Sequence, residues 1–510
     1  MVQQDSLKTS TDELSLRRLI PHSLKKRISE WRKLKGISQV VLAWIEEGVA
    51  LPFQRVPIPK IFNNKNIPYL ESQFITQEVK RMLDCGAILQ LNEPPLICSP
   101  IHAVPKKNGK FRLVIDMRYL NSHLVVPKFK MEGLDTLSKM VEADDYMFTV
   151  DLQDGYYHIN MHKSAIRYLG FQWQGNYYTY KVLPFGLAIS PLVFSKIMHS
   201  IVSHLRQLGH RILVYLDDFI GLTRNKSMVL KKVFLKLLRN LGLHISLEKS
   251  SLNLEQEKEF LGLLVRTINR LMFHVPHKKK VEVAKEISRM LKRRMEPLPA
   301  RRVARVAGLC ISLSKAVGPT RLLMRNLFKD LNQKSNWEAK VLLSEEAIND
   351  LIWWKEVMES WDGKFVIPSR ADVTIYTDAS NSGWGGALEG KSARGFWTPA
   401  MMNESINYRE MMAAFMTILA FKEDLRNKVV LLRTDNISTV AYINKMTGQS
   451  DPLYNLGRAI ANLSKELNIE LMAQHIPGVE NITADRLSRM MDKNDWKLHP
   501  RYFKLIEMKW

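Results

Sequence analysis

The segment Ile212–Leu222, with the sequence ILVYLDDFIGL, restricts the fold of this 510-residue chain more than any other. Two adjacent acids, Asp217 and Asp218, interrupt an otherwise apolar run. This pattern predicts a strand, a tight turn and a second strand, with both carboxylates at an exposed tip. Neighbouring carboxylates that are partly buried repel each other strongly, so they need a cation. The segment therefore predicts a metal site at the end of a β-hairpin.

A third acid lies upstream in FTVDLQDGYY, at residues 148–157. Asp151 ends an apolar strand, a position where a carboxylate is out of place in a core. We expect Asp151 and Asp217 to bind two Mg²⁺ ions together, because Mg²⁺ prefers carboxylate oxygens and substrate phosphates. One ion of such a pair activates an attacking 3′ hydroxyl and the other stabilises leaving pyrophosphate. The acids therefore indicate phosphoryl transfer.

The charge of the chain fits a polyanionic partner. Lys and Arg number 75 and Asp and Glu 51, so the net charge is 75 − 51 = +24, which favours binding to phosphates. An anionic membrane is the competing partner, but no apolar run reaches the roughly 18 residues that a spanning helix needs. Residues 1–15 also lack the apolar core of a signal peptide. We expect an intracellular protein, cytoplasmic or nuclear, without a membrane partner.

The cysteines give no sign of a zinc site. Cys85, Cys98 and Cys310 are an odd number and show no paired metal-ligand spacing. This pattern indicates free thiols in a reducing compartment.

The order of apolar patterns indicates several packed units. Helices are expected at 38–47 and from Tyr69 to about Gly86, separated by an extended connector around Pro52, Pro57 and Pro59. From about residue 97 to 265, short β-like runs alternate with helical ones, which is typical of an α+β unit. The runs that we expect to be strands are Phe111–Ile115, Tyr146–Leu152 and Ile212–Tyr215.

Residues 275–330 have a different character. They carry 15 Lys and Arg against 4 Asp and Glu, a balance of 15 − 4 = +11. Val283, Ile287 and Leu291 recur at a spacing of four, which predicts basic amphipathic helices. Such helices either grip a phosphate backbone or present a solvated charged face. The first interpretation is favoured by the acid motifs on both sides.

A second set of acids follows in the C-terminal third. Each acid lies at the end of an expected strand or helix, in the phrases YTDAS, NYRE, VVLLRTD and NITADRLSR; the residues are Asp378, Glu410, Asp435 and Asp485. Four such acids suit two divalent ions. His475 precedes the last acid by ten residues, a position that suits proton transfer or product release.

Five motifs in one order carry a resemblance to reverse transcriptases. They are PKKNGKFRLVIDMRYLN at 105–121, DLQDGYY at 151–157, LPFGLAISP at 183–191, YLDD at 215–218 and FLGLLV at 260–265. By this resemblance, Asp151, Asp217 and Asp218 match the catalytic, metal-binding acids. FLGLLV looks like the primer grip, at Phe260, Leu261 and Gly262.

The same resemblance implies a site for the incoming deoxynucleotide. Arg112, together with Lys106 or Lys107, matches the positions that hold the triphosphate. Tyr156 matches the aromatic residue that blocks a ribose 2′ hydroxyl, an exclusion by shape. Phe185 and Gly186 match the loop that lines the nucleotide pocket. The alternatives are plain core packing for Tyr156, a structural loop position for Phe185, and simple exposure for one of the two lysines.

The C-terminal set resembles ribonuclease H, with Asp378, Glu410, Asp435 and Asp485 matching its metal ligands and His475 its mobile histidine. One departure is that only Lys445, Arg458 and Lys465 are basic between Asp435 and His475. Free-standing members of that family can carry a strongly basic helix there. We therefore expect this domain to depend on the upstream basic helices to hold its substrate.

Together the resemblances imply an α+β right-hand polymerase (fingers, palm and thumb) followed by an α/β ribonuclease H-like domain. The expected boundaries are a basic extension at 1–60, fingers and palm at 61–270, a basic helical thumb or connection at 271–370, ribonuclease H at 371–492 and a tail at 493–510. Mg²⁺ or Mn²⁺, two ions per active site, is the implied cofactor. The implied partners are an RNA template, a DNA primer, RNA–DNA hybrid and deoxynucleoside triphosphates.

The phrases NYREMMA, TDNISTVAYIN and HIPGVENITADRLSR look like retroelement polyproteins of the DIRS group. That resemblance implies a tyrosine recombinase of the same element as a further partner. Three alternatives are an RNA-dependent RNA polymerase, an inactive nucleic-acid-binding protein and a structural polyprotein fragment. Tyr156 and the second acid set disfavour the first, and the presence of all seven acids disfavours the others.

Overall fold

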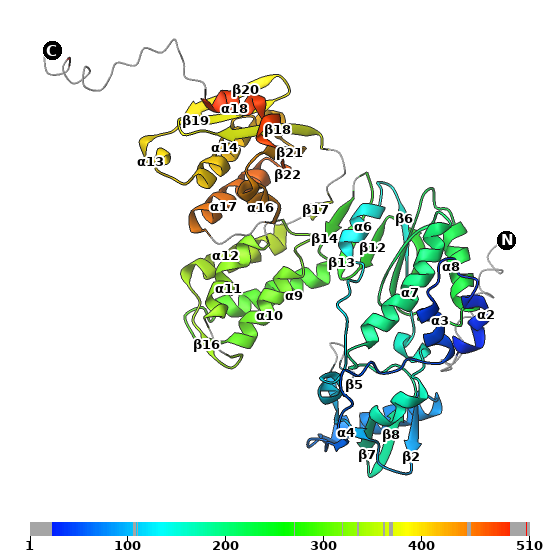
Figure 1. The fold of residues 1–510 in the computed structure, drawn as a ribbon. Coiled ribbons are helices and arrows are strands. Elements are labelled where there is room, and N and C mark those ends of the chain that lie inside the picture. The colour runs from blue at the N-terminus through cyan, green and yellow to red at the C-terminus, as the bar shows by residue number, and fades with distance from the viewer. Residues whose placement is uncertain are drawn as a thin grey trace, which may run out of the picture. The chain divides into compact units, whose positions relative to one another are not determined.

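The structure is a computed structural model that describes residues 23–105, 109, 111–269, 271–318, 320–333, 336–360, 363–366, 371–445, 450–489 and 506. The chain forms two compact units, Met1–Leu271 and Met272–Trp510 (Figure 1). No helix in the described ranges is long and apolar enough to cross a membrane.

A four-stranded antiparallel sheet carries the first acid motifs. Its strand order is β11 (Ser251–Glu255), β6 (Tyr146–Asp151), β10 (Asp218–Thr223) and β9 (Arg211–Tyr215). The sheet packs against α6 (Leu134–Met140), α7 (Ser190–Gln207) and α8 (Val229–Asn240). Its two central strands are mostly buried, because apolar side chains lie on both of their faces. This burial places the acids at the strand ends beside a rigid core.

A second, mixed sheet in the first unit has the order β1 (Lys60–Ile61), β3 (Ile97–Cys98), β7 (Gly170–Trp173), β8 (Asn176–Tyr180) and β2 (Ile88–Leu91). Helix α4 (Tyr69–Asp84) is tied to it, because the Trp173 indole N–H donates to Thr76 Oγ1 at 3.1 Å. The chain leaves α4 at Gly86, whose φ of +75° suits a residue without a Cβ.

Smaller elements complete the first unit. They are the hairpins β4 (Ile101–Pro105) with β5 (Phe111–Ile115) and β12 (Glu257–Phe260) with β13 (Leu263–Arg266), the helix α5 (Arg118–Asn121), and the 3₁₀ helices η2 (Gly155–His158) and η3 (Lys163–Tyr168).

The described part of the expected N-terminal extension belongs to the core of the first unit. It contains η1 (Lys25–Arg27), α2 (Ile28–Trp31) and α3 (Gln39–Glu46), and Ser38 caps α3 by accepting from the Val40 N–H. Trp31 is fully buried, and its indole N–H donates to the Leu241 carbonyl at 3.0 Å. This segment is therefore part of the same hydrophobic core as the central sheet.

The second unit begins with helices. They are α9 (His277–Leu291), α10 (Ala300–Ile311), η4 (Leu322–Met324), α11 (Arg325–Asn332) and α12 (Glu345–Ser360), with the short strand pairs β14 (Met272–His274) with β17 (Lys364–Phe365) and β15 (Leu298–Pro299) with β16 (Lys340–Val341). On α9, Val283, Ile287 and Met290 are buried. The expected amphipathic character of the basic segment is therefore confirmed for this helix.

A five-stranded sheet forms the rest of the second unit, with the order β20 (Lys391–Phe396), β19 (Gly383–Leu388), β18 (Val373–Ala379), β21 (Val429–Thr434) and β22 (Glu470–His475). The first three strands are antiparallel, and β18, β21 and β22 are parallel. The remaining elements are α13 (Pro399–Met402), α14 (Ile406–Ala420), α15 (Lys422–Leu425), α16 (Ile437–Lys445), α17 (Asp451–Glu466), η5 (Gly478–Glu480) and α18 (Ile482–Arg489).

Helix α18 lies directly on β19, and glycine makes this possible. A Cβ at Gly385 would lie 2.5 Å from the Ala484 carbonyl oxygen and 2.6 Å from the Leu487 Cβ. The close contact brings the residues of α18 to the edge of the sheet where β18 ends.

Candidate active sites

The sheet of the first unit brings the first acid set together. Asp151, the last residue of β6, is the cross-strand partner of Asp218, the first residue of β10. Asp217 precedes Asp218 in the turn after β9, and its carbonyl accepts from the Leu152 N–H at 3.2 Å. Leu216 makes this turn with a φ of +55°. The three acids predicted from the sequence therefore lie side by side at one sheet end.

These acids are half-buried or buried, whereas the sequence pattern had predicted an exposed tip for Asp217 and Asp218. That expectation was wrong because the chain after β6 covers the turn. A Cβ built on Gly155 would lie 3.5 Å from the Asp217 Cβ and 2.8 Å from the Phe194 ring. Gly155 thus lets the backbone pass close to the turn.

Crowding of negative charge shows in the pKa values. Burial, and then the charges of Asp217 and Asp151, raise the pKa of Asp218 to about 6. Burial also raises the pKa of Asp151, and the charge of Lys249 opposes this rise. The Lys249 ammonium lies 3.3 Å from Asp151 Oδ1, an ion pair without a well-formed hydrogen bond. Asp151 Oδ1 is otherwise buried without a hydrogen bond from the described residues.

Such a set of oxygens fits a divalent cation. All three side chains offer carboxylate oxygens, the ligands that Mg²⁺ prefers, and one buried oxygen lacks a hydrogen-bond donor. Burying carboxylates is costly; Lys249 offsets part of this cost, and a divalent cation would offset more of it.

Two aromatic rings border the acids. The ring centroids of Tyr156 and Phe185 lie 4.7 Å apart, and Phe194 lies 5.1 Å from Tyr156 on its other side. Burial, and then the charge of Asp217, raise the pKa of Tyr156 to about 12. Phe185 is 48% exposed. Tyr156 therefore packs against the core and lies between Asp217 and the exposed Phe185 ring.

The Phe185 loop is held by a residue that the sequence interpretation missed. Asn121 donates from Nδ2 to the Gly186 carbonyl at 2.9 Å and accepts from the Ala188 N–H at 2.8 Å. Gly186 has a φ of +93°, and a Cβ there would lie 2.8 Å from the Ile115 carbonyl oxygen. Asn121 ends the quoted RYLN motif, but only the fold shows which loop it contacts.

Of the three basic residues expected to bind the triphosphate, the structure describes only Arg112. Arg112 is exposed on β5, opposite Val104. Lys106 and Lys107 lie outside the described residues.

A cavity of about 480 Å³ joins Asp151 and Asp218 to the β12–β13 hairpin. Phe260 is buried, and Leu261 and Gly262 form the turn with φ values of +49° and +74°. All three line this cavity. Lys258, another lining residue, is buried and donates to Ser251 Oγ at 2.6 Å. The expected primer-grip residues and two of the acids therefore face one cavity.

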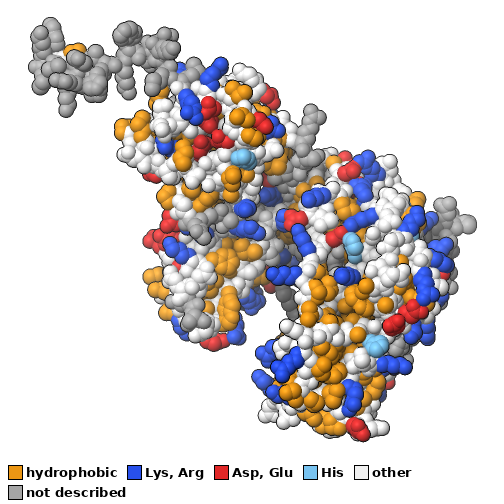
Figure 2. Space-filling model, viewed as in Figure 1, with side chains coloured by type: hydrophobic (Ala, Val, Ile, Leu, Met, Phe, Trp, Pro, Cys, Tyr) orange, Lys and Arg blue, Asp and Glu red, His pale blue; other side chains and the backbone are white. Residues whose placement is uncertain are grey.

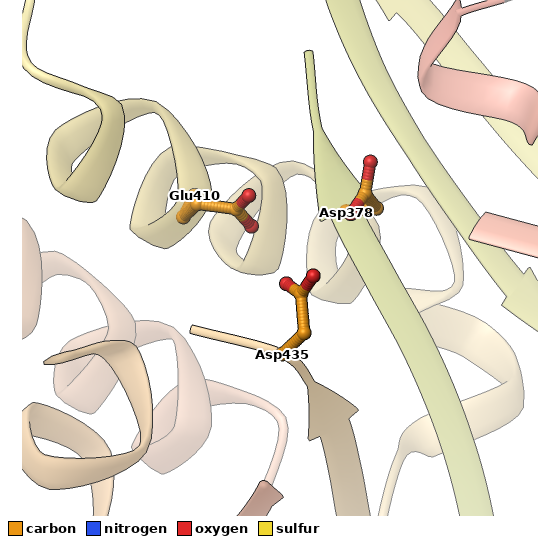
Figure 3. A group of neighbouring side chains, drawn as sticks. All are labelled: Asp378, Glu410 and Asp435. Atoms are coloured by element: carbon orange, nitrogen blue, oxygen red, sulfur yellow. The ribbon is translucent and has the colours of Figure 1, made fainter. Parts of the chain in front are cut away.

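The second acid set forms a compact group on the other unit. Oxygen atoms of Asp378, Glu410 and Asp435 all lie within 4.8 Å of one another. Asp378 extends from β18, Glu410 from α14 and Asp435 from the end of β21, and their carboxylates point toward one another (Figure 3). Acidic side chains gather on the face of this unit seen in Figure 2.

Burial again raises the pKa values of these acids. Burial, then Asp378 and Asp435, raise the pKa of Glu410 to about 9. Glu410 Oε2 is buried and accepts no hydrogen bond from the described residues. Burial also raises the pKa of Asp378, while the Ser488 hydroxyl, which donates to Asp378 Oδ2 at 2.6 Å, lowers it. Buried carboxylates with an unpaired oxygen are again suited to a divalent cation.

Asp485 and His475 are near this group but outside it. The Asp485 carboxylate accepts from Arg489 Nε at 2.6 Å, an ion pair within α18, and its charge contributes to the raised pKa of Asp378. His475 is exposed at the end of β22, where its register partner is Thr434, the residue before Asp435. Sequence reasoning missed Ser488 and Arg489, although both lie in the quoted phrase NITADRLSR.

Two of the three basic residues between Asp435 and His475 contact α12. Arg458 Nη1 lies 3.4 Å from Asp350 Oδ1, and Lys465 Nζ lies 5.9 Å from the Trp353 ring centroid. Asp350 is 1% exposed and also accepts from Asn326 Nδ2 at 2.9 Å. Arg458 and Lys465 thus bind the sheet domain to the helices before it.

Comparisons with known proteins agree with this architecture. Residues 104–265 match the sequence model of the family described as reverse transcriptase (RNA-dependent DNA polymerase). Two foamy viral protease-reverse transcriptase structures are similar to the chain. One, with double-stranded DNA, gives a TM-score of 0.56 at 17% identity and covers 90% of this chain and 83% of that chain. The other, with RNA/DNA hybrid, gives a TM-score of 0.54 at 17% identity and covers 95% of this chain and 67% of that chain. The predicted fold class is confirmed.

Curated relatives extend the match to most of the chain. The retrovirus-related Pol polyprotein from transposon 297 of Drosophila melanogaster is 26% identical over 90% of this chain and 43% of its own length. A putative enzymatic polyprotein of Cassava vein mosaic virus is 24% identical over 91% and 70%. The Tf2-7 polyprotein of Schizosaccharomyces pombe is 22% identical over 91% of this chain and 33% of its own length. The chain is thus similar to polyproteins of retroelements and retrovirus-like elements, and it spans less than half the length of two of these relatives.

Proposed function

We propose that this chain is a DNA polymerase that copies RNA and DNA templates and degrades the RNA strand of the resulting hybrid. The observation that carries the proposal is the pairing of Asp151 with Asp218 beside Asp217, in a segment that matches the reverse transcriptase family. A second acid group at Asp378, Glu410 and Asp435 supports the nuclease activity.

In the polymerase site, Asp151, Asp217 and Asp218 hold two Mg²⁺ or Mn²⁺ ions, which supply charge stabilisation for phosphoryl transfer. The primer end lies in the cavity bordered by Phe260, Leu261 and Gly262. Tyr156 and Phe185 provide an aromatic surface for the sugar of the incoming deoxynucleotide. Arg112, with Lys106 or Lys107, binds its triphosphate. Tyr156 excludes a 2′ hydroxyl by its bulk.

In the nuclease site, Asp378, Glu410, Asp435 and Asp485 hold the cations, and His475 assists proton transfer or product release. Arg489 pairs with Oδ1 of Asp485, so a cation bound by that oxygen would compete with the ion pair. The basic helix α9 holds the hybrid through phosphates, because an A-like duplex is recognised by shape and backbone.

We further infer a place among retroelement polyproteins of the DIRS group, where a tyrosine recombinase of the same element would be a partner. The proposal rests on the phrases NYREMMA, TDNISTVAYIN and HIPGVENITADRLSR. The domain boundaries proposed are 1–60, 61–270, 271–370, 371–492 and 493–510. The three free cysteines fit an intracellular setting.

The test is primer extension on an RNA template with Mg²⁺ and deoxynucleotides, with the fate of the template RNA followed in parallel. Asp217→Asn is expected to abolish DNA synthesis and to spare cleavage of preformed hybrid. Asp435→Asn is expected to do the reverse. A wild-type protein that makes no DNA with either metal would overturn the polymerase proposal and favour an inactive binding protein.

A further inference from the structure

His158 lies behind the polymerase acids, and nothing in the proposed chemistry uses it. It is 1% exposed and follows the Tyr156–Tyr157 pair in η2. Its ring nitrogens contact two different segments. Nδ1 lies 3.0 Å from the Gly155 carbonyl oxygen, and Nε2 accepts from the His244 N–H at 3.0 Å.

These two contacts fix the tautomer. Because a carbonyl can only accept, Nδ1 must carry the proton and donate to Gly155. Because the His244 N–H can only donate, Nε2 must be bare. A neutral imidazole satisfies both partners, whereas a protonated one would place its Nε2–H against the backbone N–H of His244. Burial, which outweighs the hydrogen bond to Gly155, lowers the pKa of His158 to about 3.

The segment reached through His244 supports Asp151. The Gln153 N–H donates to the His244 carbonyl at 3.0 Å, and the Ser246 N–H donates to the Asp151 carbonyl at 2.8 Å. The Asp151 N–H donates to Ser250 Oγ at 3.0 Å, and Lys249 pairs with the Asp151 carboxylate. Residues 244–250 therefore run beside the end of β6 and hold its last residue.

The segment reached through Gly155 carries Tyr156, the aromatic residue proposed to exclude a 2′ hydroxyl. A Cβ on Gly155 would lie 2.8 Å from the Phe194 ring and 3.5 Å from the Asp217 Cβ, so η2 approaches the turn closely at this glycine. Tyr156 follows it directly and contacts Phe185 and Phe194.

We propose that His158 is a positioning residue that joins these two segments and thereby fixes the distance between Tyr156 and the acid cluster. The inference rests on the proposed polymerase function and deepens it, since it assigns sugar discrimination partly to a residue that cannot touch the nucleotide. The Tyr156 ring can exclude a 2′ hydroxyl only if it cannot move away from the acids. Displacements of about 1 Å in a site can change rates by about a hundredfold.

The experiment compares incorporation of dTTP and UTP opposite adenine on a primed template, in the full chain with Mg²⁺. The readout is the ratio of kcat/KM for dTTP to that for UTP, which does not depend on the fraction of active protein. His158→Phe fills the site but makes neither hydrogen bond. His158→Gln can donate to Gly155 and accept from His244.

For His158→Phe we expect the dTTP/UTP ratio to fall by about tenfold or more, mostly through a better KM for UTP. For His158→Gln we expect the ratio to stay within about twofold of wild type. The matched control is His162→Phe, because the His162 ring bonds locally to Ser164, two residues later, and not to the segment that supports Asp151. Cleavage of preformed hybrid by the same preparations checks the second unit.

A wild-type ratio in His158→Phe, in a variant that still extends primers, would overturn this inference and leave the polymerase function intact. An equal fall in His158→Gln and His158→Phe would also overturn it, because the two hydrogen bonds would then not be what matters. A wild-type chain that incorporates neither nucleotide would overturn the proposed function, and the inference with it.

Discussion

Asp151 and Asp218 are directly opposed residues of neighbouring antiparallel strands, so the sheet itself sets the separation of their backbones. In the proposed polymerase site, the pairing register of β6 and β10 therefore determines where these two metal-binding acids lie. A shift of one residue would turn every side chain of β6 to the opposite face.

We predict that the polymerase loses metal affinity as the pH falls through about 6. The pKa of Asp218 is raised to about 6, so its carboxyl binds a proton more tightly when folded than when unfolded. Protonation then competes with the cation, while stability of the metal-free protein rises toward low pH. The measurement is the Mg²⁺ concentration for half-maximal DNA synthesis at several pH values between about 5.5 and 8, a range that includes the raised pKa of Asp218. A pH-independent midpoint would contradict the prediction.

We predict that Glu410→Gln abolishes hybrid cleavage and stabilises the metal-free protein. The pKa of the buried Glu410 carboxyl is raised from 4.5 to about 9, so at neutral pH this group must take up a proton when the metal-free protein folds, which costs stability. The amide removes that cost, and we expect a gain of about 1 to 3 kcal/mol, the range for an uncompensated buried polar group. Thermal unfolding with and without Mg²⁺ measures this. The gain should shrink as the pH falls toward 4.5, because the glutamate of the unfolded chain is then protonated as well and folding no longer requires proton uptake. A gain that grows at low pH would contradict the account.

We predict that Ser488→Ala slows hybrid cleavage and moves the acid limb of its pH profile upward. The Ser488 hydroxyl donates to Asp378 Oδ2 at 2.6 Å and lowers the pKa of that acid. Without it, Asp378 takes up a proton at a higher pH. The matched control is Ser464→Ala, because the buried Ser464 hydroxyl makes no hydrogen bond to the described residues. Equal pH profiles for the two variants would refute this role.

We predict that the exposed lysines of the basic helical segment make phosphate contacts. Lys285 and Lys292 are exposed on and just after α9. The double variant to Gln should weaken hybrid binding and reduce the slope of log K against log salt by about 0.7 to 0.9 per lost contact. Lys355→Gln with Lys422→Gln, two exposed lysines elsewhere in the same unit, is the charge-matched control. If both pairs change the slope equally, the segment has no special role.

We predict that a fragment starting at residue 371 cleaves hybrid poorly. Arg458 and Lys465 would lose Asp350 and Trp353, and Tyr454, which accepts from Asn326 at 3.1 Å, would become exposed. Restoring residues 272–370 should restore cleavage in a salt-sensitive manner. Robust cleavage by the short fragment would show that the upstream helices are dispensable.

Local patterns predicted much of this fold. The strand at 111–115 appears with the predicted bounds, and the strand predicted at 146–152 is β6. The helix predicted from Tyr69 to about Gly86 is α4, which begins at Tyr69 and ends at Asp84. Apolar periodicity sufficed in each case, since these segments have one clear buried face.

The supporting contacts could not be predicted in the same way. Ser488 bonds to a residue 110 positions away, and His158 to one 86 positions away. A hydrogen bond between segments far apart in the chain produces no periodic pattern of residues, so it cannot be predicted from a single sequence. The partial burial of Asp217 was missed because the sequence pattern of the hairpin does not show that Gly155, from another segment, lies close to its side chain.

Trp31 shows what the motifs alone would leave out. It fills a space beside the carbonyl of Leu241, and Ser23 donates to the neighbouring Gly242 carbonyl at 2.8 Å. A chain shortened to begin at residue 61 would keep every polymerase motif yet open a void of indole size at the end of α8. By the usual cost of deleting a large buried ring, about 3 to 5 kcal/mol, such a truncated enzyme would fold poorly. The smallest fragment of this chain that folds is therefore longer than the stretch that carries the polymerase motifs.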